Sequence, residues 1–247
     1  MKLGVQCYTL RSEFQKDARN TFRQIADIGI RYIELAGLYD ESPETIRGWL
    51  DDYGLDVVGS HVGLDRLEGD LPGLIEENRV LRNRYVVLPW VSREDYRLGW
   101  SAFGQRLESI AKRLQDAGLE FAYHNHAFEF ESEGGRPGLD VLFDTTDPNL
   151  VKAEIDTAWV HHGGQDPAGY IRKLAGRVPL VHLKDITDNP DFLDVEAGGG
   201  VLDWDSILAA CREAGVEAGV IELDECPGPP FESVRLSLEF FRGKGVG

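Results

Sequence analysis

Short apolar runs alternate along the chain with longer segments whose apolar residues recur at helical spacing. The short runs predict buried β-strands, and the periodic segments predict amphipathic helices. Expected strands cover residues 3–7, 31–35, 55–59, 85–88, 119–124, 151–156, 178–187 and 219–222. Expected helices include 17–28, 43–54, 71–82, 139–145, 167–175 and 231–241, with a long helix ending at Gly118 and another beginning after Asp203. Ser42 with Pro43 is a typical helix start, and Gly54 a typical helix end.

The order of strand and helix persists to the end of the chain, with no linker of domain-boundary composition. This order predicts an α/β protein with a single (β/α)8 TIM barrel over residues 1–247. A doubly wound open sheet is the competing architecture, but no strand is followed by a GxGxxG turn. The glycine run 198–200 follows the seventh strand. It would either bind a phosphate or let the loop turn, and backbone geometry is the commoner use of loop glycines.

Composition and charge narrow the class of protein. Hydrophobic residues make up 42% and charged residues 28%, which is ordinary for a globular domain. The formal net charge of −17 would repel a polyanion, so a nucleic-acid partner is not expected. Three scattered cysteines (Cys7, Cys211 and Cys226) fit free thiols in a reducing compartment. No apolar window is long enough for a signal peptide or a membrane span, so we expect a cytoplasmic protein without a membrane partner.

Polar residues stand where the expected strands end, and in a parallel barrel these ends converge on one mouth. The polar tips are Glu34, His61, His124, His126, Glu154, Asp156, His182, Lys184 and Glu222. Among them, two imidazoles and two carboxylates on the last four strands suit one divalent cation (Mn²⁺, Co²⁺, Zn²⁺, Fe²⁺ or Mg²⁺); they are His124, Asp156, His182 and Glu222. A metal-free polar cluster is the alternative, but so many ionisable groups would be costly to desolvate together.

Strand alternation bears on Lys184 and Glu154. Lys184 shares a face with His182, which favours a role at the mouth over simple pairing with Asp185 or Glu154. Glu154 lies one pleat deeper than Asp156, where it would be a buried partner of Lys184 or Lys152.

Several motifs spread along the whole chain carry a family resemblance. They are VQCYTLR, YIEL, GSH, YHNHAFEF, EIDTAW, VHLKD, GGGVLDW and IEL. The chain resembles the xylose isomerase-like barrel superfamily, and within it the sugar phosphate isomerase/epimerase group, which includes inosose dehydratase, dehydroshikimate dehydratase and ketose 3-epimerases. The resemblance implies a catalytic metal held by an acid on strand five, Asp on strand six, His on strand seven and Glu on strand eight. The last three correspond to Asp156, His182 and Glu222. Where many members have Glu-Asn-His, this chain has His124-Asn125-His126, so the resemblance gives His124 or a neighbour the first ligand position.

This departure bears on the reaction. Ketose 3-epimerases use paired glutamates on strands five and eight, so losing one disfavours simple 3-epimerisation and leaves isomerisation or elimination through a metal-stabilised enediolate. The expected catalytic groups are His126, Glu222 or Glu154 as base and Lys184 as the group that stabilises the oxyanion or protonates a leaving hydroxyl. The expected substrate contacts are Glu34, His61, Asn125 and Trp159, the last as an apolar face for a sugar ring.

The expected protein is a metal-dependent isomerase, epimerase or lyase that acts on a small polyhydroxylated carbonyl compound such as a sugar, a sugar phosphate or an inosose. An endonuclease IV-like phosphodiesterase is an alternative, disfavoured by the charge of −17 and only six histidines. A second alternative is a barrel that binds a sugar without catalysing a reaction. The fold alone cannot decide between these functions. Apolar residues from Trp90 to Trp100 would serve either a homo-oligomer contact or a lid over the mouth.

Overall fold

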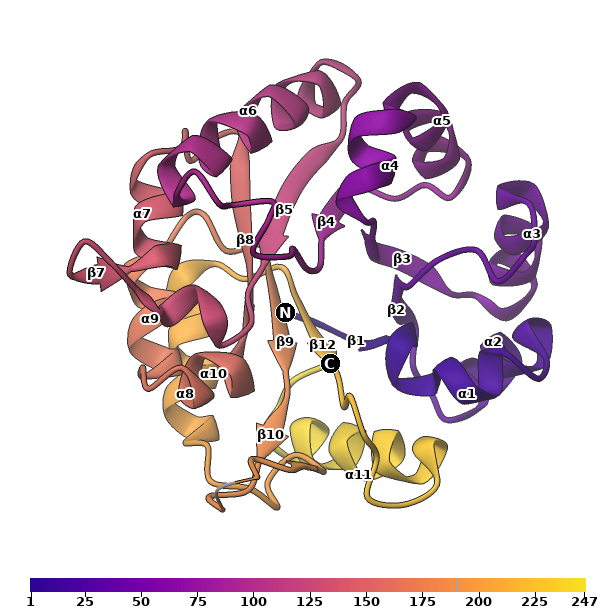
Figure 1. Cartoon of the computed structure of the whole chain (residues 1–247). Coiled ribbons are helices and arrows are strands. Elements are labelled where there is room, and N and C mark those ends of the chain that lie inside the picture. The colour runs from indigo at the N-terminus through magenta and orange to yellow at the C-terminus, as the bar shows by residue number, and fades with distance from the viewer. Residues whose placement is uncertain (190) are drawn as a thin grey trace.

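The strands of the computed structural model, which describes residues 1–189 and 191–247, close into a parallel barrel (Figure 1). The barrel strands are β1 (Lys2–Gln6), β2 (Tyr32–Leu35), β3 (Asp56–His61), β4 (Tyr85–Leu88), β5 (Glu120–His124), β8 (Val151–Asp156), β9 (Leu180–Leu183) and β12 (Ala218–Ile221). They follow one another around the barrel in chain order, and β12 returns to pair with β1. The predicted (β/α)8 barrel is therefore confirmed, and the open doubly wound sheet is excluded.

Helices form a ring outside the strands (Figure 1). They are α1 (Arg11–Phe14), α2 (Ala18–Asp27), α3 (Pro43–Tyr53), α4 (Leu64–Gly69), α5 (Leu71–Val80), α6 (Trp100–Asp116), α7 (Gly138–Asp144), α8 (Thr157–His162), α9 (Pro167–Lys173), α10 (Trp204–Ala214) and α11 (Pro230–Gly243), with 3₁₀ turns at Cys7–Leu10 and Phe128–Phe130. The short helices α4 and α8 were not expected. The carboxylate of Asp156 caps α8 by accepting from the Trp159 N–H at 2.9 Å, so a strand-end residue also begins the next helix.

The loops contain two small antiparallel sheets of two strands each. One pairs β6 (Ser132–Glu133) with β7 (Arg136–Pro137), and the other pairs β10 (Asp185–Ile186) with β11 (Asp194–Val195). The glycine loop wraps around the carboxylate of Asp185, which accepts from the N–H groups of Gly198 at 2.9 Å and Gly200 at 3.2 Å. A Cβ on Gly200 would lie 2.2 Å from Asp185 Oδ1. These glycines therefore serve backbone geometry, because a side chain of the protein itself already occupies their N–H donors.

Two apolar cores support the barrel. The larger fills the space between the strands and the helices. The smaller lies inside the barrel and consists of Val58, Tyr85, Val87, Ala122, Leu180, Ala218 and Val220. Inward-facing positions therefore change from apolar to polar toward the C-terminal ends of the strands, as between Leu180 and His182 on β9. The inner core therefore lies beneath the polar residues of the mouth.

The segment from Trp90 to Trp100 divides into two parts. Trp100 is buried and stacks on Tyr96, with ring centroids 4.2 Å apart, so it belongs to the core. Trp90 and Leu98 are exposed, at 55% and 78%. Cys7, Cys211 and Cys226 are free thiols, as expected. Among the described residues, no helix has the length and apolar character to cross a membrane.

Candidate metal centre and active site

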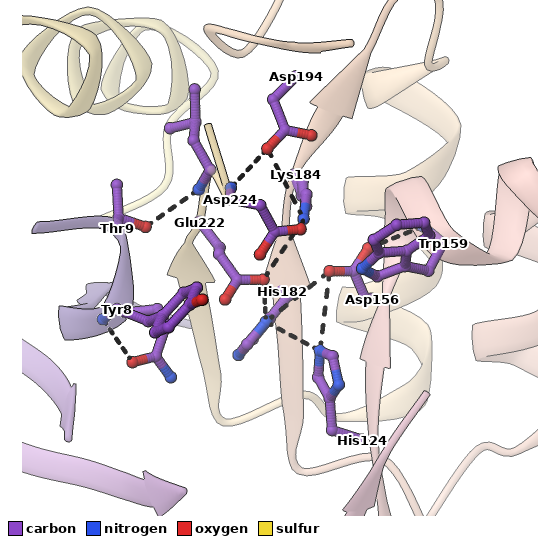
Figure 2. Close-up of polar contacts among 12 residues, drawn as sticks. Tyr8, Thr9, His124, Asp156, Trp159, His182, Lys184, Asp194, Glu222 and Asp224 are labelled. Atoms are coloured by element: carbon purple, nitrogen blue, oxygen red, sulfur yellow. Dashed lines mark hydrogen bonds and ion pairs between the residues drawn. The ribbon is translucent and has the colours of Figure 1, made fainter. Parts of the chain in front are cut away.

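Four strands deliver four ligand-type side chains to one point at the barrel mouth. His124 ends β5, Asp156 ends β8, His182 lies on β9, and Glu222 follows β12 directly. One ligand atom from each lies within 4.8 Å of all the others. Figure 2 shows the four side chains pointing toward one another. The structure thus brings together the set singled out in the sequence.

His182 is the centre of this cluster. Its Nδ1 atom lies 2.8 Å from Glu222 Oε2 and 3.1 Å from His124 Nε2. Asp156 Oδ2 is 3.8 Å from the same Nδ1 and 3.7 Å from His124 Nε2. All four side chains are buried. Solvent therefore screens their charges little.

The electrostatics of the cluster favour added positive charge. Burial acts to lower the pKa of His182, but the charges of Glu154 and Glu222 outweigh it and raise the pKa well above its ordinary value. Burial acts to raise the pKa of Glu222, but His182 and Lys184 hold it well below the usual range. Burial raises the pKa of Asp156 to about 7. Positive charge on the Nδ1 side of His182, from a proton or a cation, is therefore stabilised by Glu222.

The donor set fits a divalent cation. Asp156 Oδ2 is buried and has no hydrogen-bond partner among the described residues, whereas Oδ1 caps α8. His124 Nδ1 lies 3.3 Å from the carbonyl oxygen of Pro89, which directs Nε2 into the cluster. Two imidazole nitrogens and two carboxylate oxygens are ligands that Zn²⁺, Mn²⁺, Co²⁺ and Fe²⁺ accept. We therefore regard His124, Asp156, His182 and Glu222 as the candidate metal centre.

A second polar layer lies on the other side of His182. His61 Nε2 is 2.8 Å from Glu154 Oε2, and His182 Nε2 is 2.7 Å from Glu34 Oε2 and 3.3 Å from Glu154 Oε2. The expectation that Glu154 pairs with Lys184 or Lys152 was wrong, because its side chain faces the barrel interior toward the two imidazoles. Burial and the charge of Glu34 raise the pKa of Glu154 to about 7.

Lys184 is buried beside the candidate metal centre. Its Nζ forms an ion pair with Asp224 and lies 3.9 Å from Glu222 and 4.9 Å from the centroid of the Trp159 ring. Burial acts to lower the pKa of Lys184, but Glu222, Asp156 and Asp224 outweigh it and raise the pKa. Pairing with Asp185 or Glu154 does not occur, whereas the predicted shared face with His182 is confirmed.

An open cavity of about 430 Å³ leads to this cluster. Its lining residues are Tyr8, Ala36, His61, Pro89, Trp90, His124, His126, Glu222 and Asp224. Sequence reasoning missed Tyr8 and Asp224 as cavity residues, whereas Trp90 belongs to the segment for which a lid over the mouth was one of two expected roles. The position of Asp224 had a signal, since it lies two residues beyond Glu222 and so shares its face in an extended chain.

Other expected site residues lie outside the cavity wall. Glu34 is fully buried beneath His182. Asn125 is also fully buried, and its Oδ1 accepts from the Asp156 N–H at 3.1 Å, so it ties β5 to β8. Trp159 covers Lys184 and borders a separate cleft of about 10 Å³. Their expected substrate contacts stay predictions.

His126 borders the cavity, and its backbone is held by a buried carboxylate. Glu129 accepts from the His126 N–H and from the Tyr123 hydroxyl, each at 2.9 Å. Burial lowers the pKa of His126 to about 2, with further lowering by His124, so its ring is neutral. Its Nδ1 atom is buried and has no hydrogen-bond partner among the described residues.

Comparison with known proteins agrees with this architecture. A family model described as xylose isomerase-like TIM barrel matches residues 22–244. The inosose dehydratase of Geobacillus kaustophilus (strain HTA426) is 24% identical over 262 residues, which cover 88% of this chain and 84% of that protein.

Solved structures resemble the whole chain. A sugar phosphate isomerase/epimerase from Parabacteroides distasonis ATCC 8503 superposes with a TM-score of 0.83 at 22% identity, covering 98% of this chain and 97% of that one. The IOLI protein with a bound zinc atom gives a TM-score of 0.74 at 16% identity, covering 98% of this chain and 97% of that one. At these identities the two likenesses concern the fold.

Proposed function

Because the chain belongs to the xylose isomerase-like TIM-barrel family, we propose that it is a divalent-metal-dependent lyase acting on a small polyhydroxylated ketone. The enzyme removes a proton from the carbon beside the carbonyl group, and a hydroxyl group leaves as water. The observation that carries this proposal is that His124, Asp156, His182 and Glu222 meet at the end of a cavity that is lined by His124, His126 and Glu222. The inosose dehydratase relative supports a cyclic polyol ketone as the substrate class.

The reaction needs positive charge near the carbonyl oxygen, where negative charge develops as the proton leaves. A divalent cation held by His124, Asp156, His182 and Glu222 supplies Lewis acidity at that point. Lys184 adds a second fixed positive charge beside Glu222. Because its pKa is raised, Lys184 stays protonated and acts mainly by stabilising the oxyanion.

The proton acceptor in this proposal is His126. Its ring borders the cavity, and its Nδ1 atom has no hydrogen-bond partner among the described residues, so this lone pair is available to a proton. The Glu129 contact to the His126 backbone holds this ring near His124, with ring centroids 5.0 Å apart. His61 borders the cavity and is the group we assign to a substrate hydroxyl.

Elimination is favoured over 3-epimerisation by the ligand on β5. Epimerisation at one carbon needs a base on each of its two faces, and here strand five ends in His124 instead of a carboxylate. One base suffices for loss of water: His126 takes the proton from carbon and passes it to the leaving hydroxyl, whose C–O bond breaks as the C=C bond forms. Isomerisation shares the first proton transfer and therefore stays within the same chemistry.

The test is solvent isotope exchange with the metal-loaded protein. Inososes and ketohexoses are incubated in D₂O with Mn²⁺, Co²⁺ or Zn²⁺ and followed by NMR. We expect deuterium beside the carbonyl group and a product that has lost water, both absent with Asp156→Asn. Exchange without loss of water would replace the lyase with an isomerase or epimerase. Bound sugar that shows neither exchange nor product would refute catalysis and favour a sugar-binding barrel.

A further inference from the structure

His182 contacts a carboxylate on the side that faces away from the candidate metal centre. Its Nε2 atom lies 2.7 Å from Oε2 of Glu34, a distance typical of a charge-assisted N–H···O hydrogen bond. Both side chains are fully buried. His182 thus has one ring nitrogen toward the metal centre and the other toward Glu34.

The local structure of β2 and β3 lets Glu34 reach this position. The pairing of the two strands shifts between Ile33 and Glu34, so Glu34 lies beside Gly59 and Val58 is skipped. A Cβ on Gly59 would lie 2.3 Å from Glu34 Oε1, so only glycine leaves room for the carboxylate. Gln6 Nε2 donates to Glu34 Oε2 at 2.9 Å and fixes it from β1.

We propose that Glu34 is a positioning residue that sets the tautomer of His182. It accepts the Nε2–H of the imidazole, and this keeps the Nδ1 lone pair directed toward His124, Asp156 and Glu222. A neutral imidazole carries one N–H, so the partner of one nitrogen decides which nitrogen can bind a metal. The inference rests on the metal centre of the proposed function and assigns Glu34 to that centre instead of to the substrate.

A second cation is the competing account of the same residues. Glu34, His61, Glu154 and His182 also have ligand atoms within 4.8 Å of one another. Two cations would share His182, however, and the ring would have to lose both of its N–H protons. The Nδ1 side of the ring meets the cavity through His124 and Glu222, whereas Glu34 and Glu154 on the Nε2 side are fully buried and do not line it. We therefore assign a proton, and not a metal, to Nε2.

The experiment compares Mn²⁺ affinity in three variants, measured from the EPR signal of free Mn²⁺. Glu34→Leu removes the acceptor and should weaken Kd about ten- to hundred-fold. Glu34→Gln keeps an acceptor oxygen and should retain most of the affinity. Gly59→Ala leaves every hydrogen-bonding group in place but displaces Glu34, so it should weaken binding in the same direction as Glu34→Leu.

A spectroscopic readout separates positioning from general loss of structure. In the zinc-loaded protein, two-bond ¹H–¹⁵N spectra should show His182 protonated at Nε2, with its signals identified by their loss in His182→Gln. This pattern should change in Glu34→Leu and persist in Glu77→Leu, the same substitution at a buried glutamate on α5 that pairs with Arg66.

Three results would overturn the inference. Unchanged Kd and His182 signals in folded Glu34→Leu would exclude positioning. If Glu34→Leu does not fold, unchanged values in Gly59→Ala decide the question in the same way. Two Mn²⁺ ions per wild-type chain, falling to one in Glu34→Leu, would show a second cation site. Wild-type protein that binds no metal would instead refute the proposed function itself.

Discussion

Glu129 allows a quantitative test of how the cavity-lining residue His126 is held. Its carboxylate is fully buried and accepts only neutral donors in the described hydrogen bonds, the Tyr123 hydroxyl and the His126 N–H. Burial raises its pKa from 4.5 to about 8. The folded protein therefore binds a proton at Glu129 that the unfolded chain has already lost at neutral pH.

The pKa difference sets the direction and size of the effect on stability. Because the folded pKa is the higher one, the contribution of Glu129 is fully present below pH 4.5 and is lost as the pH rises to about 8. The difference between the two pKa values corresponds to at most roughly 5 kcal/mol of stability. The slope is about 1.4 kcal/mol per pH unit inside that window.

The perturbation is Glu129→Gln, which keeps an acceptor oxygen and removes the titration. Urea unfolding from about pH 5 to about pH 9 gives the free energy of unfolding of both proteins. The stability of the variant relative to wild type should increase by several kcal/mol across this range and then level off. Glu131→Gln, a change at an exposed glutamate, is the control and should run parallel to wild type. Parallel curves for wild type and Glu129→Gln would refute the raised pKa.

Two further changes probe other contacts of the mouth. Lys184→Met should lower kcat about 10²- to 10³-fold with a smaller change in KM, because the lost charge acts on the developing oxyanion. Lys152→Met is the control. Equal kcat in the two variants would contradict this role of Lys184. Asp185→Ala leaves the N–H groups of Gly198, Gly200 and Leu202 and the Trp204 indole without their acceptor, so the free energy of unfolding should fall by about 3 kcal/mol, with a smaller loss in Asp185→Asn. Urea denaturation measures this change, and equal stability of Asp185→Ala and wild type would refute the anchoring role.

The barrel and the grouping of the four ligand-type side chains were predictable because both follow from simple periodicities. The runs 85–88 and 151–156 coincide with β4 and β8 as observed. Alternation then placed His182 and Lys184 on the inward face. The ligand-type residues stand at the ends of the strands. Identifying the last residue of each strand was therefore enough to group His124, Asp156 and Glu222 without coordinates.

The roles of the deeper residues depend on contacts between strands that no local pattern contains. Glu34 reaches His182 because the β2–β3 register shifts and Gly59 lacks a side chain. Glu154 meets His61 from a strand far away in the sequence. The short helix α8 escaped prediction because its cap, Asp156, was already interpreted as a strand end.

The most direct test of the account is the metal content of the purified protein, measured by elemental analysis beside His182→Ala and the control His161→Ala. The account predicts about one divalent ion per chain in wild type and in His161→Ala, and its loss in His182→Ala. A wild-type protein without bound metal that takes up no Mn²⁺, Co²⁺ or Zn²⁺, or a His182→Ala variant that retains its metal, would contradict the candidate centre.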